Sequence, residues 1–378
     1  MKVLQVIPDL RKGGAERITL DICNELMRKG AEVLLLNFRP ENHYSFLTEK
    51  IKRQVVPARF VPSVTKKPLA ELEGYKAAVL QFQPDVIHSH LFEAEIVTRQ
   101  VIVPGVKYIT HLHSNMEQLN KFSARTLTSK SSIINYVERK LLLKQYRKCA
   151  NNFIAISNDT KEYYDRMLPG DLKRLRVMYN AIDYNRFFTP HKKTLDNKAA
   201  KLITVGSLVP RKNQEFLVKV AQRLHEEGYP IHLDILGEGP CRKKIEAQIR
   251  ACGLQQYITL QGNVERVEEY LHRADIYVHS ATYEPFGLSP VEAMAAGLPC
   301  VMLDAMGNRD IADEGRNCFL IPQGNENAFG AALKKIINFP ARYSEMSEYA
   351  RSYASKFDIA PYTERLLKFY ASCAKAPA

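Results

Sequence analysis

The 378-residue sequence has no tryptophan, only seven cysteines, and no apolar run that approaches the roughly 18 residues of a membrane span. The cysteines lie singly, without the close pairs that metal sites and redox motifs use, and their odd number argues against a disulfide framework. The first apolar run is broken at Pro8 and Asp9, too early for a signal-peptide core. We therefore expect a cytoplasmic protein that is neither secreted by a signal peptide nor integral to a membrane.

Basic residues are concentrated in one half of the chain. The formal net charge is +13, and residues 1–195 contain 32 lysines and arginines against 19 acidic residues. The remaining residues contain 22 of each kind, so the whole excess lies in the N-terminal half. A one-sided positive field attracts an anionic partner, which here is a lipid surface, a nucleic acid or a phosphorylated substrate. A solvated basic face without a partner is the alternative.

Short apolar runs alternate with segments of helical periodicity, which is typical of chains that build parallel sheets from strand and helix units. Five strands are predicted in the first half, at 3–7, 32–38, 85–90, 107–112 and 153–157. Five more are predicted in the second half, at 202–208, 232–239, 257–263, 276–281 and 299–304. The polar, non-periodic segment 189–201 indicates a linker or domain edge. The predicted fold class is α/β, with two doubly wound, Rossmann-like domains.

A glycine pair follows the first predicted strand. Gly13 and Gly14 precede a helix whose Ile18, Ile22 and Leu26 recur at helical spacing. Free backbone N–H groups at a helix N-terminus hold an anion, and glycine allows that anion a close approach. The spacing is not a dinucleotide fingerprint, because G-x-G-x-x-G is absent. A plain tight turn is an equally good interpretation of this loop alone.

Two cations follow the first strand of the second half. Arg211 and Lys212 lie at the start of a predicted helix, just beyond a strand that ends in glycine. Ligands of open parallel sheets bind beyond the carboxyl ends of the strands, and cations there suit a diphosphate. Surface solubility is the alternative, although a cation at this end of a helix opposes the macrodipole.

The stretch YEPFGLSPVEAMAAGLP carries two glutamates, Glu284 and Glu292, on either side of a glycine turn. With Ser289 as N-cap and Pro290 as the first helical residue, Glu292 completes a capping box, which explains this glutamate structurally. It does not explain Glu284. Backbone N–H groups of residues 286–288 at a helix N-terminus bind phosphate, while flanking carboxylates accept hydrogen bonds from sugar hydroxyls. Nucleotide sugars need this combination of groups.

With these residues the chain resembles the retaining glycosyltransferases of family 4, whose E-x7-E signature Glu284 and Glu292 match. The resemblance covers nearly the whole chain, since several further motifs occur in that family's order. They are GGAE, DVIHSH, THLHSN, FIAIS, VMYNAIDYNRF, VGSLVPRKN, LGEGP, LQGNV and AMGNRDIADEGRNCFLIP. The family fold is GT-B, with two facing Rossmann-like domains. It implies an acceptor-binding domain of residues 1–184 plus about 360–378 and a donor-binding domain of residues 185–359, with helix 361–372 returning to the first.

The resemblance also implies roles for individual residues. Glu292 would bind the nucleotide ribose and Glu284 hydroxyls of the transferred sugar, while Lys212, helped by Arg211, would neutralise the diphosphate. Backbone donors would come from Phe286, Gly287 and Leu288. Gly13 and Gly14 would approach the diphosphate or the acceptor from the other domain. Gly237, Gly239 and the Gly262 turn with Asn263 and Val264 would line the nucleobase pocket. The histidine near the transferred sugar matches His113, with His111 as the alternative register.

Two departures from the family pattern concern the donor details. Ser207 stands where an arginine is often found, so Lys212 and Arg211 would carry the diphosphate neutralisation. Asp310 replaces a frequent glutamate, and Met306 with Gly307 replaces a glycine pair.

The activity that the resemblance implies is transfer of a hexose-type sugar from a nucleotide diphosphate sugar to a glycan or lipid-linked glycan, as in bacterial surface polysaccharide synthesis. Departure of the diphosphate concentrates negative charge, which cations and helix N–H groups stabilise, so neither a metal nor a cofactor is expected. Similar enzymes are thought to retain configuration by front-face attack. Glu284 as a glycosidase-like nucleophile is the alternative.

The acceptor side is linked to the basic half. Residues 138–150 form a predicted helix with an apolar stripe and several cations, preceded by Lys121, Arg125 and Lys130. It could lie peripherally on the anionic inner face of the cell membrane and meet a lipid-diphosphate-linked sugar. An ordinary domain helix with basic exposed positions is the alternative.

Two further functions fit parts of the sequence. A nucleotide-sugar epimerase of the same fold would use the donor without an acceptor, but the E-x7-E turn with Lys212 speaks against it. A nucleic-acid-binding protein is suggested by charge alone, and we expect no nucleic-acid partner because no motif supports it and tryptophan is absent. His88 and His90, at a strand end, are either site residues or hydrogen-bonded core residues.

Overall fold

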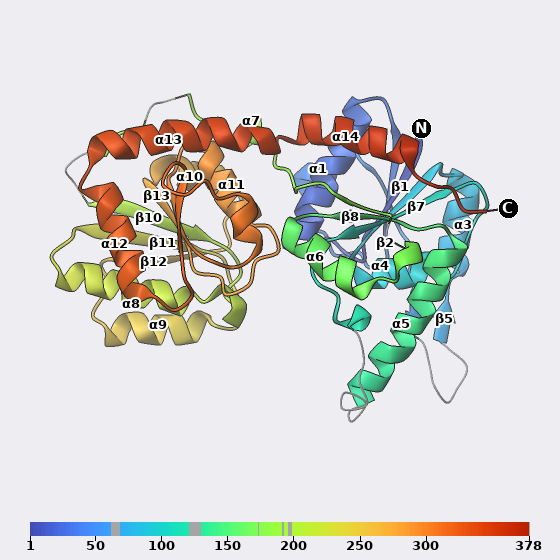
Figure 1. The fold of residues 1–378 in the computed structure, drawn as a ribbon, viewed down its shortest axis with the longest axis horizontal. Helices are drawn as coiled ribbons and strands as arrows, with labels where there is room; N and C mark the ends of the chain where they lie inside the picture. The colour runs from blue at the N-terminus through green and yellow to red at the C-terminus, as the bar shows by residue number, and fades with distance from the viewer. Residues whose placement is uncertain (62–68, 121–129, 173, 191–192, 196–198, 378) are drawn as a thin grey trace. The chain divides into compact units, whose positions relative to one another are not determined.

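The computed structural model describes residues 1–61, 69–120, 130–172, 174–190, 193–195 and 199–377 (Figure 1). The chain forms two compact units. Unit 1 comprises Met1–Ala181 together with Ile359–Ala378, and unit 2 comprises Ile182–Asp358. Unit 1 is therefore assembled from both ends of the chain.

Unit 1 contains a seven-stranded, fully parallel sheet of order β3-β2-β1-β6-β7-β8-β9. Its strands are β1 Lys2–Val6, β2 Glu32–Asn37, β3 Lys52–Val55, β6 Val86–His90, β7 Lys107–Leu112, β8 Asn152–Ala155 and β9 Leu175–Val177. A small antiparallel pair, β4 Arg59–Val61 and β5 Leu69–Glu71, stands apart from it. The helices are α1 Gly14–Arg28, α2 Ser45–Thr48, α3 Glu73–Phe82, α4 Leu91–Thr98, α5 Lys130–Lys148, α6 Asn158–Met167 and α14 Ile359–Ser372.

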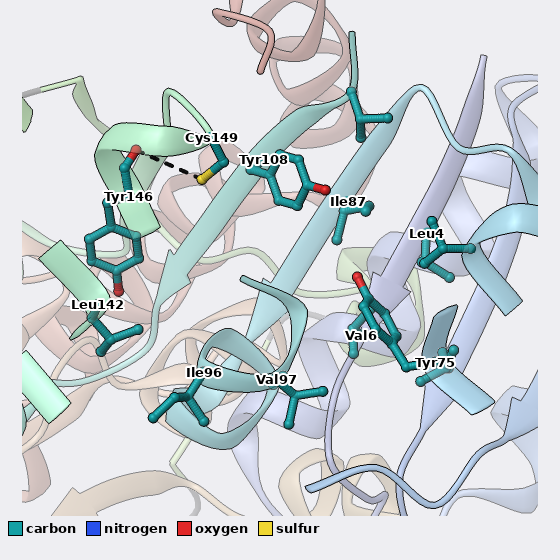
Figure 2. Close-up of a cluster of buried hydrophobic side chains, with 14 of the residues drawn as sticks. Leu4, Val6, Tyr75, Ile87, Ile96, Val97, Tyr108, Leu142, Tyr146 and Cys149 are labelled. Carbon is teal, nitrogen blue, oxygen red and sulfur yellow. Dashed lines mark hydrogen bonds between the residues drawn. The ribbon is translucent and has the colours of Figure 1, made fainter. Parts of the chain in front are cut away.

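Helices cover both faces of the unit 1 sheet, and the side chains of each strand alternate between these two buried faces. On β1, Leu4 and Val6 join the core under α3, α4 and α5, whereas Val3 joins the core under α1 and α14. Figure 2 shows the first of these cores, in which Leu142 and Tyr146 from α5 face the sheet. On the other face, the Tyr370 hydroxyl of α14 lies 2.6 Å from His88 Nδ1. The last helix of the chain is thus an integral part of unit 1.

Unit 2 contains a six-stranded parallel sheet of order β12-β11-β10-β13-β14-β15. Its strands are β10 Ala200–Val205, β11 Ile231–Leu236, β12 Ile258–Gly262, β13 Ile276–His279, β14 Cys300–Leu303 and β15 Cys318–Ile321. The helices are α7 Tyr184–Phe187, α8 Gln214–Glu226, α9 Arg242–Ala251, α10 Val267–Arg273, α11 Leu288–Ala295, α12 Glu326–Ile337 and α13 Pro340–Ala354. Helices α8 and α9 lie on one side of the sheet in Figure 1, and α11 and α13 on the other.

The ten strands expected from apolar runs are all present, so the predicted α/β class with two parallel sheets is confirmed. The sequence pattern did not indicate β3, β9 or β15, which are all edge strands. Edge strands are short and often polar, and β3 reads KRQV. No helix among the described residues is long and apolar enough to cross a bilayer.

The expectation of a linker or domain edge at 189–201 is wrong, because this segment lies inside unit 2. The Lys193 Nζ atom donates hydrogen bonds to the carbonyls of His272 and Ala274, at 2.9 and 2.6 Å, at the C-terminal end of α10. Lys193 is therefore attached to unit 2. Residues 191–192 and 196–198 lie outside the described residues.

The packing of α14 predicts the effect of two substitutions on that helix. Leu366 is fully buried in the core shared with α1, so Leu366→Ala should lower the free energy of unfolding of unit 1 by about 2–5 kcal/mol. Lys368 is exposed on the same helix, and Lys368→Ala should change it by less than about 0.5 kcal/mol. Urea denaturation followed by circular dichroism measures both. Equal effects of the two changes would contradict the integration of α14 into unit 1.

Candidate active site

The candidate residues lie where each parallel sheet reverses its strand order. In unit 1 the reversal falls between β1 and β6, and in unit 2 between β10 and β13. Ligands of such sheets bind beyond the carboxyl ends of the strands at this point. Gly13 follows β1 and His90 ends β6, while Lys212 follows β10 and Glu284 follows β13. The sequence-predicted residues are therefore at the expected edge of each sheet.

The Tyr44 hydroxyl group forms hydrogen bonds with the glycine loop of unit 1. Gly13 caps α1 in an extended conformation, and its N–H group donates to the Tyr44 hydroxyl at 3.0 Å. The same hydroxyl lies 3.0 Å from the Gly13 carbonyl oxygen. A Cβ atom on Gly13 would collide with the carboxylate of Glu16, which folds back over the helix start. Burial raises the pKa of Glu16 to about 7.

A pocket of about 470 Å³ adjoins this loop within unit 1. Apart from Glu16, its charged side chains are paired with one another. Asp9 accepts hydrogen bonds from Arg11 and Arg39, and Arg39 also forms a bidentate pair with Glu93, with both N–O distances 2.8 Å. Leu91, at the pocket wall, has a φ of 68°, a strained conformation for a leucine that often marks a functional site.

Both candidate histidines, His111 and His113, line this pocket. They project from β7 and from the residues just after it, on the same face of the sheet as His88 and His90. His111 is fully buried, whereas His113 is half-buried and its Nε2 atom lies 2.9 Å from His90 Nδ1. His113 is thus the more accessible of the two, and the choice between them stays a prediction.

Among the described residues, His88, His90 and His111 form the one group of three metal-ligating side chains, with their ring nitrogens within 4.8 Å of one another. The rings of His88 and His111 are stacked, with an interplanar angle of 7°. Lone pairs lie in the ring planes, so stacked rings do not aim at one ion. Both nitrogens of His90 are engaged, with Gln5 and with His113. His88 and His90 are therefore hydrogen-bonded core residues.

In unit 2, Lys212 and Glu284 form an ion pair between the loops after β10 and β13. Their side chains are only 14% and 12% exposed. Burial by itself would raise the pKa of Glu284, but the Lys212 ammonium and His279 outweigh it and hold that pKa well below the usual value. Glu284 is therefore ionised, and Lys212 is its counter-charge.

Hydrogen bonds fix the two loops to each other. The carbonyl oxygens of Arg211 and Lys212 accept from the Thr282 N–H group and the Ser280 hydroxyl, each at 2.8 Å. Arg211 itself is exposed, so its guanidinium group is available to an anion. Lys212 is thereby positioned by its backbone as well as by its charge.

The turn that carries Glu284 differs from the expected capping box. Helix α11 begins at Leu288, and its N-cap is Gly287 with a φ of 89°, not Ser289. The left-handed glycine starts the helix two residues earlier than the Ser-Pro pattern indicates. Phe286 is almost fully buried, and Glu292 is half-buried within α11. The capping-box explanation of Glu292 is therefore wrong.

The glycines expected near the nucleobase have structural reasons. A Cβ atom on Gly237 would meet the carbonyl oxygen of Gly206, and one on Gly239 would meet that of Leu208. The Gly237 N–H group also donates to the Gly262 carbonyl oxygen at 2.7 Å, which places the exposed Asn263 and the neighbouring Val264 next to it. These residues are together at one end of unit 2, and their contact with a nucleobase stays a prediction.

The sequence pattern did not single out His279 or the paired charges of the unit 1 pocket. His279 is the last residue of β13, and its Nε2 atom lies 3.4 Å from Glu284 Oε2. A polar residue at the carboxyl end of an apolar strand was the available signal. Arg39 follows β2 and Glu93 lies in α4, so the two residues meet only in the folded chain.

Comparison with known proteins assigns the class. Residues 185–353 match the family model described as Glycosyl transferases group 1, and residues 12–186 match the one described as Glycosyltransferase Family 4. Together the two matches span most of the chain. The protein belongs to this family of glycosyltransferases and is a transferase enzyme.

Individual relatives agree with this assignment. EpsF of Bacillus subtilis is 25% identical over 320 residues, which cover 81% of this chain and 79% of that one. The Campylobacter jejuni N-acetylgalactosamine-N,N'-diacetylbacillosaminyl-diphospho-undecaprenol 4-alpha-N-acetylgalactosaminyltransferase is 25% identical over 201 residues, 52% of this chain and 53% of that one. The crystal structure of Anabaena HepE with UDP and glucose matches with a TM-score of 0.77 at 20% identity, over 98% and 100% of the two chains. The fold is GT-B.

The glutamate turn predicts a stability difference between two glycine substitutions. A Cβ atom on Gly307 would clash with the carbonyl groups of Glu284 and Pro285, so Gly307→Ala should lower the free energy of unfolding of unit 2 by about 1–3 kcal/mol. Gly330 lies in α12 with open space around it, and Gly330→Ala should be neutral or stabilising by up to about 1 kcal/mol. Denaturant midpoints measure both. A neutral Gly307→Ala would contradict the close approach.

The histidine row predicts acid sensitivity of unit 1. Burial lowers the pKa of His88, His90 and His111 well below the usual value and that of His113 to about 3. An unfolded chain takes up protons at these side chains below about pH 6.5, whereas the folded unit does not, so stability falls as the pH falls from 6.5.

Buried carboxyl groups oppose this effect, because burial raises the pKa of Glu16 and of Glu95 to about 7 and also raises that of Glu138. Four histidines against Glu16 and Glu95 leave a net slope of up to about 2.7 kcal/mol per pH unit between pH 6.5 and 4.5. Thermal unfolding at pH 7.5, 6.0 and 5.0 measures it. His113→Gln should reduce the slope, and an unchanged melting temperature across this range would overturn the prediction.

Proposed function

We propose that this glycosyltransferase moves a hexose-type sugar, with retention of configuration, from a nucleotide diphosphate sugar to a glycan or lipid-linked glycan in bacterial surface polysaccharide synthesis. The observation that carries the proposal is the ion pair of Lys212 and Glu284 at the switch point of unit 2. One partner suits a diphosphate and the other suits sugar hydroxyls. A nucleotide sugar presents both groups side by side.

Unit 2 is the proposed donor-binding domain. Lys212 and the exposed Arg211 neutralise the diphosphate, and the backbone of Phe286, Gly287 and Leu288 offers donors at the start of α11. Glu292 binds the ribose and Glu284 the transferred sugar. The nucleobase lies against Gly237, Asn263 and Val264. These groups stabilise the charge of the departing nucleotide without a metal ion. The similarity to HepE, solved with UDP and glucose, supports this assignment.

Unit 1 is the proposed acceptor-binding domain. Its pocket contains His113 and lies beside the loop of Gly13 and Gly14. In the front-face route, the acceptor hydroxyl attacks the anomeric carbon on the side that the diphosphate leaves. The leaving phosphate oxygen takes the hydroxyl proton. His113, uncharged because its pKa is lowered, hydrogen-bonds the transferred sugar without repelling the developing positive charge.

Contact with an anionic membrane is proposed for the N-terminal half of α5. The C-terminal half packs Leu142, Leu143 and Tyr146 into the core, as in an ordinary domain helix. Near the start of α5, Ile133 and Ile134 are 41% and 38% exposed. Lys140, near the middle of the helix, is also exposed. Lys121 and Arg125 lie outside the described residues. The Campylobacter relative, whose name gives a diphospho-undecaprenol acceptor, supports a lipid-linked substrate. The enzyme would then act from the cytoplasm.

No observation on the described residues favours a nucleotide-sugar epimerase or a nucleic-acid-binding protein.

A thermal-shift panel of UDP-, GDP-, ADP- and dTDP-sugars without added metal tests the proposed donor site. At 100 times its dissociation constant, one of these ligands should stabilise the protein by about 2.7 kcal/mol, a rise of several degrees in melting temperature. Lys212→Met and Glu292→Gln should abolish most of the shift, whereas Lys243→Met, an exposed lysine on α9, should retain it.

Each variant is first compared with the wild type by circular dichroism, because Lys212→Met leaves Glu284 without its counter-charge. A folded wild-type protein that responds to none of the four donors would overturn the donor-site assignment.

A further inference from the structure

Glu284 has two neighbours with nitrogen donors, Lys212 and His279, and only one of them is hydrogen-bonded to it. Lys212 Nζ donates to Glu284 Oε2. His279 Nε2 lies 3.4 Å from the same oxygen but makes no well-aligned hydrogen bond to any described residue. Its side chain is only 3% exposed. A buried N–H group without an acceptor is unfavourable, so this arrangement needs a reason.

Arrival of the donor would create a conflict over Lys212. Under the proposed function the ammonium group must neutralise a diphosphate, which carries more charge than one carboxylate. The Glu284 side chain is 12% exposed, so without Lys212 its charge would be left without a partner in a largely water-excluded place. Another hydrogen-bond donor has to reach Glu284 Oε2 if the carboxylate is to stay ionised and keep its orientation.

We propose that His279 is a positioning residue. It becomes the hydrogen-bond partner of Glu284 when the Lys212 ammonium group moves to the diphosphate of the donor sugar. The neutral imidazole donates a hydrogen bond from Nε2–H to Glu284 Oε2, and no proton is transferred. The carboxylate can still accept hydrogen bonds from the hydroxyl groups of the sugar. This inference rests on the proposed function. The approach needs only a small movement, because the two atoms are already 3.4 Å apart.

The location of His279 supports this role. It ends β13, which pairs with β10 and β14, so its backbone is fixed in the centre of the sheet. Its ring stacks against Tyr277, with centroids 6.1 Å apart and an interplanar angle of 22°. Burial lowers the pKa of His279, with Glu284 opposing, which keeps the ring neutral near pH 7. The His279 ring is therefore held in place, uncharged, and directed at one carboxylate oxygen of Glu284.

The test compares nucleotides that do and do not recruit Lys212. The nucleoside diphosphate whose sugar stabilises the wild type best is titrated by calorimetry beside its monophosphate. His279→Leu should weaken diphosphate binding about 10-fold or more, as expected for a lost hydrogen bond to a charged group, and change monophosphate binding less than about twofold. His279→Gln retains an N–H donor and should restore most of the diphosphate affinity.

A purely structural role of His279 would weaken both nucleotides alike, and that result, or no loss with either, overturns the proposal. In a Lys212→Met background, His279→Leu should have no further effect on the diphosphate, and a second 10-fold loss there would also overturn it. If the wild type binds none of the nucleotide sugars, the proposed function itself fails, which separates the two failures. Circular dichroism of each variant confirms that the comparison is made on folded protein.

Discussion

Parallel strand pairing is the constraint on which the rest of this molecule depends. It places the carboxyl ends of all strands of a sheet at one edge and requires a long crossover connection between neighbouring strands, which is usually a helix. The loops after β1 and β6 therefore meet in unit 1, and the loops after β10 and β13 meet in unit 2. Groups that are some 70 residues apart in the sequence, such as Lys212 and Glu284, become neighbours without any local signal.

The two units solve the problem of burying polar groups in different ways. Unit 1 keeps a row of histidines neutral and connects it through Gln5, Tyr370 and ring stacking, so this row itself brings no charge into the core. Unit 2 instead encloses a full ion pair. A neutral row is insensitive to a charged ligand, whereas an ion pair responds to one, because a stronger anion competes for its cation. The ion pair is therefore the more responsive of the two arrangements to a phosphate-bearing ligand.

The sequence was sufficient for the interior of the fold and for the family to which the chain belongs. The central strands are buried on both faces, so their apolar runs were visible, whereas the edge strand β3 reads KRQV and was not. Motif spacing selected Lys212 and Glu284, but their pairing depends on two loops meeting in space. The helix start at Gly287 was missed because Ser289-Pro290 fits a cap equally well in the sequence. His279 is a single histidine at the end of a strand, and this pattern by itself does not distinguish a structural core residue from a functional one.

The construction of unit 1 from both ends of the chain has a consequence for synthesis. Ile182–Asp358 is continuous, so unit 2 has all its residues once the ribosome has passed that segment. Unit 1 begins first and finishes last, since α1 and the sheet face with His88 and Gln5 wait for α14, the last helix to emerge. A nascent chain thus carries an apolar sheet face that α1 covers only in part throughout the translation of unit 2, and it is exposed to aggregation during this interval.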